Sequence, residues 1–508
     1  MATQQQSAKN VKWVEGLRGM ASVLVIMTHI SRAFDYGLFF PQDTPEAAPR
    51  LLQLPILRVP WQGRIGVPIF AFLTGFVCAL KPLKLARQGR QGQGDALMAI
   101  ARSAFRRPPR LVLPAAIATT ISMVLTVLGA YVSSSHCDSF WVRFDTPNRE
   151  PTLWLEVCRY FRVLLSTWTN SDNVYDRHQW AMRPLLVGAF QVYVLLAATM
   201  GMRFKYRMVV HALLMTYWWL NREVHTETFG AMIALGTLLA DLSQHRPTQA
   251  FIAAHHRVLS LVVAPCLILT GLYIGSYPQE HEDWAPWSRW LMDYFVNMNP
   301  PEGQPRGSLL VPEGTDPRRR FTAANIQLFA VAVFVSPMLR EALSSRWLLW
   351  LGHHSFAVYL THGTILRTVG IWVAYGIVPH YAQREDGSWE TESHVAGPWR
   401  VRLAILVFIC LTYSAAWAWM RWVDTACARA TKWLEARVFE PEDENDHEAA
   451  EKGYGRVNGV NGNGYPGGDG GHKEMNGGMN GGANGHTRHP SMRDRMNTTR
   501  QGPHQHSP

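Results

Sequence analysis

The sequence has 508 residues and a formal net charge of +11, and it combines 47% hydrophobic residues with only 17% charged residues. This charged fraction lies below the quarter or so that is typical of soluble globular domains. The mean hydropathy of −0.07 averages long apolar runs with polar loops and a polar tail. Because the basic residues lie between apolar runs and not on a soluble domain, the charge argues against a nucleic-acid-binding protein.

The apolar runs predict an all-α, polytopic membrane protein. A membrane-spanning helix needs roughly 20 mostly apolar residues. We expect a cytoplasmic N-terminus over 1–12, a membrane domain over 13–440 and a tail over 441–508. About ten transmembrane helices are expected in the membrane domain, at 13–34, 63–80, 111–132, 181–201, 206–220, 227–241, 258–277, 324–343, 347–366 and 403–423.

The basic residues predict the orientation. Residues 81–110 carry eight Lys and Arg side chains against Asp95 alone. The positive-inside rule places this stretch in the cytoplasm. An even number of spans then puts both termini in the cytoplasm and the loops 133–180, 278–323 and 378–402 on the opposite side. The polar N-terminus lacks the shape of a cleavable signal, so the first span is expected to be an uncleaved anchor.

Two features concern the tail and the cysteines. Residues 441–508 are rich in Gly and Asn, cannot bury a core, and are expected to be disordered and cytoplasmic. The six cysteines show no C-x-x-C spacing, which argues against a zinc or dithiol site. Cys137 and Cys158 share one predicted lumenal loop and could form a disulfide.

The first predicted span contains two residues that are costly in a membrane, Arg18 and His29. They are eleven residues apart, about three helical turns, so they share one face about 16 Å apart along the axis. Ionisable side chains within spans usually face the bundle interior or a wet cavity and serve function. The alternative is structural: Arg18 caps the inner interface, and His29 hydrogen-bonds a neighbouring helix.

Four short motifs, in order, resemble those of the membrane acyltransferase type 3 family, in a fungal-like form. The resemblance covers about residues 11–423. It is carried by EGLRG followed by His29 ten residues after Gly19, by GVPIFAFLTGF at 66–76 with Thr74 where Ser is usual, by FRRPPRLVLP at 105–114, and by LGHHSFAVYLTHGTIL at 351–366. Each motif is weak alone, but four in order on predicted spans indicate the family.

One segment departs from the family pattern. At the fourth span many members carry W-T-[IL]-P-x-E, whereas this chain reads QWAMRPLLVGAF. Trp180 matches, but Leu185 stands where Glu is expected, which puts the usual mode of acceptor recognition in doubt. Trp180 is interpreted as an interface anchor, with substrate stacking as the alternative.

The resemblance implies transfer of an acyl group, most often acetyl, from acyl-CoA to a hydroxyl. A hydroxyl needs a base at neutral pH, and His is the usual choice. We expect His29 to be that base, or else to carry the acyl group transiently. Arg18, Arg107 and Arg110 are expected to bind the CoA phosphates, because a guanidinium grips phosphate in a fork. The alternative for Arg107 and Arg110 is a simple positive-inside flank.

The last motif places Gly352, Ser355, Tyr359 and His362 on one helical stripe. Gly352 would let another helix approach closely, and Ser355, Tyr359 or His362 could donate a hydrogen bond to the thioester oxygen. The alternative is a hydrogen-bonded seam between helices. A metal site built on His362 lacks a convincing third ligand, so none is expected.

These inferences define an acyl-CoA-dependent acyltransferase, with a secondary transporter or channel and a non-catalytic relative as alternatives. A transporter would favour an internal hydropathy repeat, and the sequence shows none. We expect no bound cofactor, acyl-CoA (acetyl-CoA above all) as co-substrate, and a hydroxyl-bearing acceptor, for example from secondary metabolism. Besides membrane lipid, no obligate protein partner is expected. The expected location is the endoplasmic reticulum or another endomembrane, with the plasma membrane as an alternative.

Overall fold

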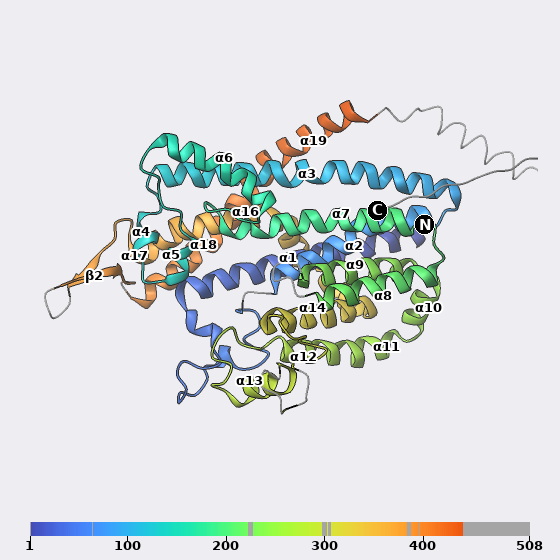
Figure 1. Ribbon diagram of the computed structural model, residues 1–508, viewed down its shortest axis with the longest axis horizontal. Helices are drawn as coiled ribbons and strands as arrows, with labels where there is room; N and C mark the ends of the chain where they lie inside the picture. Colours follow the sequence, from blue (N-terminus) through green and yellow to red (C-terminus); the bar gives the residue numbers. More distant parts are fainter. Residues whose placement is uncertain are drawn as a thin grey trace, which may run out of the picture. The chain divides into compact units, whose positions relative to one another are not determined.

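The computed structural model describes residues 2–62, 65–221, 227–296, 302, 306–383, 388–395 and 397–439. The described chain is mainly helical, and most of its long helices run side by side (Figure 1). The predicted disordered tail at 441–508 lies outside the described residues. An all-α fold is therefore confirmed for the described part of the chain, apart from one small β-hairpin.

The longest helices come from the predicted spans. The helices are α1 (Ala2–Phe34), α2 (Gly66–Ala86), α3 (Arg90–Val127), α4 (Val132–His136), α5 (Phe140–Asp145), α6 (Leu153–Thr169), α7 (Met182–Thr199), α8 (Phe204–Leu220), α9 (Glu227–Gln244), α10 (Arg246–Ala254), α11 (His256–Val258), α12 (Ala264–Ile274), α13 (Pro286–Leu291), α14 (Pro317–Val335), α15 (Pro337–Leu343), α16 (Arg346–Ile365), α17 (Ile371–Tyr375), α18 (Pro398–Trp419) and α19 (Thr425–Val438). Short 3₁₀ turns lie at η1 (Tyr36–Phe39), η2 (Leu51–Gln53) and η3 (Arg177–Ala181), and π turns at η4 (Leu259–Val263), η5 (Met292–Val296), η6 (Leu366–Gly370) and η7 (Met420–Asp424). Strands β1 (Tyr381–Gln383) and β2 (Trp389–Ser393) pair antiparallel.

The predicted count of ten spans is not confirmed. A helix overlaps each of the ten predicted ranges, but length and apolar composition qualify only five described segments as spans, or six if one bent pair is a single span. The five are Gly66–Ala86, Arg90–Val127, Arg177–Thr199, His256–Ile274 and Pro398–Val438. The helices α1 and α16 carry ionisable motif residues within their apolar runs, among them Arg18, His29 and His362, and neither is among the five.

Two predicted boundaries are wrong. The span expected at 324–343 is broken at Ser336, where α14 ends and α15 begins at an angle of 104°. Pro337 has no backbone N–H to continue the hydrogen-bond ladder, and the Ser336 side chain caps α15 through Leu339 N. The cytoplasmic loop expected at 81–110 is instead mostly helix, because α3 continues through Pro108 and Pro109.

The expected loops also contain structure. Residues 133–180 fold into most of α4, α5 and α6 and the start of η3, and 378–402 contains the β-hairpin. All six cysteines lie within the described residues and are free, so Cys137 and Cys158 do not pair. The segment between α6 and α7 returns to the helix bundle, and it positions part of the site described below.

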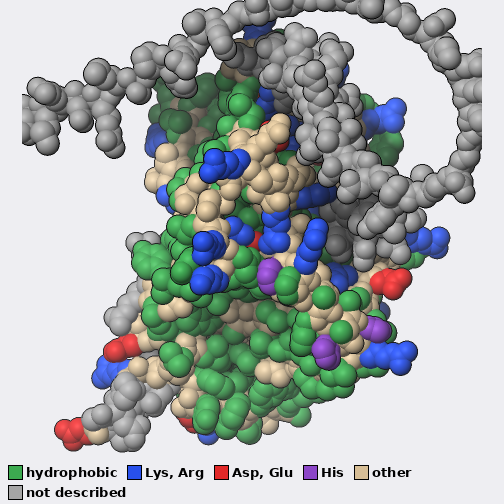
Figure 2. Space-filling view, turned by 90° about the vertical axis from the view of Figure 1, so that its right-hand side faces the viewer, with side chains coloured by type: hydrophobic (Ala, Val, Ile, Leu, Met, Phe, Trp, Pro, Cys, Tyr) green, Lys and Arg blue, Asp and Glu red, His purple; other side chains and the backbone are tan. Residues whose placement is uncertain are grey.

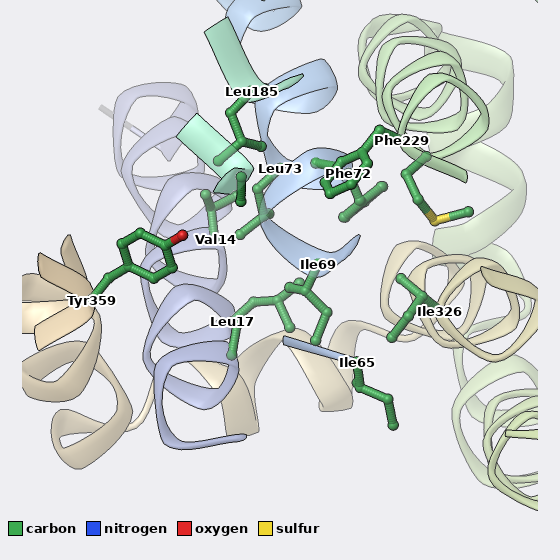
Figure 3. Packing of buried hydrophobic residues seen from close by; sticks show 14 of the residues in the cluster. Val14, Leu17, Ile65, Ile69, Phe72, Leu73, Leu185, Phe229, Ile326 and Tyr359 are labelled. Carbon is green, nitrogen blue, oxygen red and sulfur yellow. The ribbon is translucent and has the colours of Figure 1, made fainter. Parts of the chain in front are cut away.

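The core forms where α1 and α2 meet the helices around them. Figure 3 shows the side chains that pack there, and the ring of Tyr359 on α16 points toward them. The labelled residues come from six helices and the residue before α2: Val14 and Leu17, then Ile65, Ile69, Phe72 and Leu73, then Leu185, Phe229, Ile326 and Tyr359. This packing fixes α1 against both α2 and α16, the helices that carry the motifs.

Close approach of α1 to α15 and to α16 depends on glycine. A Cβ at Gly16 would lie 1.6 Å from the carbonyl oxygen of Leu343, and a Cβ at Gly352 would lie 1.9 Å from that of Glu15. Neither position has room for any side chain, since both contacts are with backbone. The prediction that Gly352 lets another helix approach is therefore confirmed, and Gly16 explains one glycine of the EGLRG motif.

Basic side chains gather at one end of the described helices. Figure 2 views that end, the right-hand side of Figure 1, and shows many Lys and Arg side chains with few acidic ones. There the buried carboxylate of Asp241 on α9 accepts hydrogen bonds from Arg207 on α8, at 2.9 Å, and from Arg87 after α2, at 3.2 Å. The predicted basic segments around 87 and 203–207 thus meet at the same end of the bundle.

Candidate active site

A cavity of about 690 Å³ brings together the predicted CoA-binding arginines. Arg18 from α1 and Arg107 and Arg110 from α3 all line it, and we call it the arginine cavity. Its other walls are largely apolar and include Val67, Phe70 and Leu185. Three guanidinium groups in one partly apolar cavity suit a ligand with both anionic groups and a carbon chain.

The contacts of the arginines leave capacity for a ligand. Arg18 makes a 3.3 Å ion pair with Glu15, one turn away, and its side chain is 36% exposed. Arg107 donates to Thr74 Oγ1 at 3.4 Å, while its buried Nε has no hydrogen-bond partner among the described residues. Thr74 belongs to the second motif, so two of the sequence motifs meet here.

Leu185, which stands where the family pattern has Glu, places an apolar side chain in this cavity. Leu185 lines the arginine cavity, as an acid at that position would. A different carboxylate, Asp424 at the end of η7, lines the same cavity. Its Oδ1 is buried and has no partner in the described part of the chain. The cavity therefore contains a carboxylate, but from a segment that the motifs do not include.

A second cavity, of about 380 Å³, contains His29. We call it the histidine cavity, because His178 lines it as well. Its walls are strongly aromatic: they include Trp141, Phe144, Trp180 and Phe229. Trp180 packs edge-on against Phe229 with ring centroids 5.7 Å apart. Trp180, predicted to be an interface anchor, therefore forms part of a cavity wall, which favours the alternative of substrate stacking.

The two cavities are neighbours. Val67 on α2 and Tyr359 on α16 line both of them. The Tyr359 hydroxyl donates a hydrogen bond to the backbone carbonyl of His178, which fixes the ring in this shared wall. Arg18 and His29, on one helix, therefore line two different cavities that share these two residues.

The predicted stripe on α16 divides among three environments. Gly352 contacts α1, Ser355 lines the arginine cavity, Tyr359 lies in the shared wall, and His362 packs against His29 with ring centroids 4.9 Å apart. The Tyr359 proton is already donated, and His362 Nδ1 lies 3.0 Å and 2.9 Å from two backbone carbonyls that only accept. Ser355 Oγ is buried without a partner in the described residues. Of the three, Ser355 keeps a hydroxyl proton free for a ligand.

The structure adds a third imidazole that the sequence analysis missed. His178 belongs to η3, before α7, and only 8% of its side chain is exposed. Its ring centroid lies 4.5 Å from that of His362 and 6.2 Å from that of His29. Three histidines from α1, η3 and α16 therefore converge at the edge of the histidine cavity.

A buried carboxylate supports this third imidazole. Asp176 Oδ1 lies 2.9 Å from His178 Nδ1 and accepts a hydrogen bond from Arg367 at 3.1 Å. Gln179 donates to the other oxygen at 3.0 Å. Burial alone would raise the pKa of Asp176, but the interaction with His178, the charge of Arg367 and these hydrogen bonds hold it below its ordinary value. Asp176 is therefore an ionised partner for His178.

A weak sequence signal for this pair existed. Residues 176–178 read Asp-Arg-His, three ionisable residues two positions before Trp180 and next to a predicted span. Distance along the chain hid their connection to His29, which lies about 150 residues earlier. The described residues contain no group of three or more His, Cys, Asp or Glu side chains arranged to hold a metal ion.

The fold and the site together define a class: a multi-helix membrane protein in which a cationic cavity adjoins a histidine-lined one. Comparison with known proteins gives the family. Residues 11–421 match the family described as "Acyltransferase domain", and the chain belongs to that family.

Relatives support the same assignment. The chain is 23% identical to O-acetyltransferase PaAT-1 of Phomopsis amygdali over 460 residues, which cover 86% of each protein. It is 22% identical to acyltransferase clz18 of Cochliobolus lunatus over 413 residues, or 70% of this chain and 83% of the relative. Acyltransferase R4 of a Phoma species is 22% identical over 414 residues, with the same coverage. No solved structure matches the chain.

Proposed function

We propose that this protein is an integral membrane O-acyltransferase that moves an acetyl group from acetyl-CoA to a hydroxyl of a small metabolite, lipid or carbohydrate. The observation that carries the proposal is the shared wall of the two cavities. Because Val67 and Tyr359 line both, a thioester whose phosphates lie among the arginines can extend toward His29. The name of the O-acetyltransferase relative supports acetyl as the group transferred.

Each side chain then has a defined task. Arg18, Arg107 and Arg110 bind the phosphates of acyl-CoA, because fixed cations with fork geometry suit a polyanion. His29 takes the proton of the acceptor hydroxyl and so makes the oxygen a nucleophile. Ser355 donates to the thioester oxygen as negative charge develops there. Transient acylation of His29 is the alternative route to the same product.

The proposed location follows from the charges. The end of the bundle rich in Lys and Arg is proposed to face the cytoplasm, where acyl-CoA is made. The arginine cavity would then receive acyl-CoA from the cytoplasm, and the acceptor would bind in the histidine cavity. An endomembrane such as the endoplasmic reticulum is the proposed compartment.

A direct assay tests the function. Membranes containing the full chain are mixed with acetyl-CoA labelled in the acetyl group and with a metabolite extract from a strain that lacks the gene, which accumulates unacetylated acceptor. We expect label in a product heavier by one acetyl increment. If the thioester stays intact while label crosses sealed vesicles, the protein is a transporter. If neither occurs in membranes that contain the protein, it is a non-catalytic relative.

A further inference from the structure

The proposed base, His29, has two imidazole neighbours whose protonation is set by their surroundings. In His362, Nδ1 lies 3.0 Å and 2.9 Å from the carbonyl oxygens of Val358 and Tyr359. A carbonyl oxygen only accepts, so Nδ1 carries the hydrogen. The other nitrogen, Nε2, then carries a lone pair, and it is buried without a partner in the described chain.

The position of a ring hydrogen in His178 is set in the same way, but by a charged acceptor. Its Nδ1 lies 2.9 Å from a carboxylate oxygen of Asp176, so Nδ1 carries the hydrogen here too. In the neutral ring its Nε2 is then a lone-pair acceptor, and this atom is buried and unpartnered within the described residues. Two imidazole rings, each with an unpartnered Nε2, thus lie beside the ring of His29, at ring-centroid distances of 4.9 Å and 6.2 Å.

Such an arrangement matters when His29 becomes charged. On taking a proton His29 changes from one N–H donor to two and gains a positive charge. The charged groups that line the two cavities beside it are Arg32, Arg177, Arg319, Arg367, Asp145 and Asp172, and Asp176 lies behind His178. The four arginines oppose a protonated His29, because like charges repel strongly in a medium of low dielectric. Fixed acceptors and a carboxylate behind one of them offset that repulsion.

Gly363 shows how closely the ring of His178 packs against α16. A Cβ on Gly363 would lie 2.2 Å from His178 Cε1. The residue after His362 must therefore be glycine for the His178 ring to reach its place. The carbonyl oxygen of Gly363 also accepts a hydrogen bond from Arg367 Nε at 3.0 Å. This bond holds Arg367, the cation that pairs with Asp176, against the turn of α16 that follows His362.

We propose that His178 and Asp176 are positioning residues for His29: they orient it and stabilise its protonated form during acyl transfer. This inference rests on the proposed function. In the transfer the hydroxyl O–H bond breaks and its proton moves to His29. The oxygen forms a bond to the acyl carbon, the C–S bond breaks, and the CoA thiolate takes the proton from His29. His178 keeps its Nδ1 hydrogen toward Asp176 throughout.

The first test separates this role from acyl-CoA binding. Asp176→Asn keeps the size of the side chain but removes the charge. We expect kcat to fall about 10- to 100-fold, the range typical of groups that orient a functional imidazole, with the KM for acetyl-CoA nearly unchanged. Asp95→Asn removes an exposed carboxylate of α3 outside both cavities and serves as the matched control. An unchanged kcat in a folded Asp176→Asn protein would overturn the inference.

A second variant covers the case in which Asp176→Asn fails to fold. His178→Gly leaves an imidazole-sized space, and added imidazole is expected to restore part of the lost kcat. A structural role alone predicts no such rescue, so a folded His178→Gly protein that imidazole leaves inactive contradicts the inference. Failure of the proposed function is distinct from both outcomes, since the wild-type protein would then form no acylated product at all.

Discussion

The arginine cavity and the histidine cavity adjoin but are built differently. The first has cations from two sequence motifs set in largely apolar walls, and its carboxylate, Asp424, comes from the last part of the membrane domain. The second has aromatic walls and a cluster of imidazoles from three distant segments. Cations on a sequence motif suit a ligand that all members of a family share, whereas aromatic walls suit an acceptor that differs between members. The comparison therefore supports the proposal that acyl-CoA binds on one side and the acceptor on the other.

Removing the proposed base from the histidine cavity should have the largest effect on turnover. For His29→Ala we expect turnover to fall by about 100-fold or more, since general-base catalysis typically contributes that much. Binding of acetyl-CoA should persist, because the arginines lie in the other cavity. The acetyl-transfer assay measures the loss, and His256→Ala, which changes an exposed histidine on α11, is the control. Near-normal turnover would remove His29 from the mechanism.

The matching experiment on the other cavity is the double variant Arg107→Gln with Arg110→Gln. Charge-assisted hydrogen bonds contribute about 1.5–3 kcal/mol each, so the KM for acetyl-CoA should rise about 10-fold or more. The effect on kcat should be smaller. Lys at both positions should rescue only in part, because Lys lacks the fork.

The control for the arginine pair is Arg90→Gln, which changes an exposed arginine at the start of α3, outside the cavity. Full recovery of affinity with Lys would mean that Arg107 and Arg110 act only as a flanking charge. The proposal that acyl-CoA binds in the arginine cavity would then lose the support of these two arginines.

A change where α1 packs against α15 should disturb both cavities at once, because α1 carries both Arg18 and His29. Gly16→Ala would place a Cβ 1.6 Å from a backbone oxygen. Overpacking of this kind typically costs about 1–3 kcal/mol of stability. We expect a lower melting temperature, read by size-exclusion chromatography after heating.

The matched control is Gly94→Ala on α3, where a Cβ would meet nothing within 4 Å. There the helix should be stabilised slightly, by about 0.5–1 kcal/mol at most. Equal melting temperatures for the two variants would contradict the close contact between α1 and α15.

The smallest perturbation concerns the side of the membrane that each cavity faces. Arg306→Asn, in an exposed turn of the 278–323 loop, completes the glycosylation signal with Gly307 and Ser308. We expect glycosylation there in a eukaryotic host, seen as a mass shift that Ser308→Ala abolishes. The natural signal at Asn497, in the expected cytoplasmic tail, should stay unmodified. The opposite pattern would place the arginine cavity on the side without acyl-CoA.

The sequence predicted the parts of this account that depend on local pattern. Apolar runs located a helix at each predicted span, and the motifs singled out Arg18, Arg107 and Arg110, which line one cavity. The motifs also singled out His29 and His362, but the packing of their rings was found only in the structure. A local pattern in the sequence does not show which residues a distant segment contributes to the site. His178 and Asp176 reach His29 only because the chain returns to the bundle after α6, and Asp424 reaches the arginines only through the turn after α18. The break at Ser336 was missed because the apolar run continues through it.

The most direct test of the central claim is to block the proposed path of the acyl group where the two cavities share wall residues. Val67→Trp would fill the space on both sides of Tyr359, whereas Val187→Trp changes an exposed position on α7 that lines neither cavity. Acetyl-CoA binding and acetyl transfer are measured on the same preparations. The account predicts that Val67→Trp still binds acetyl-CoA but transfers little or no acetyl group, while Val187→Trp does both. Full transfer by a folded Val67→Trp protein would contradict the passage of the acyl group from the arginine cavity to His29.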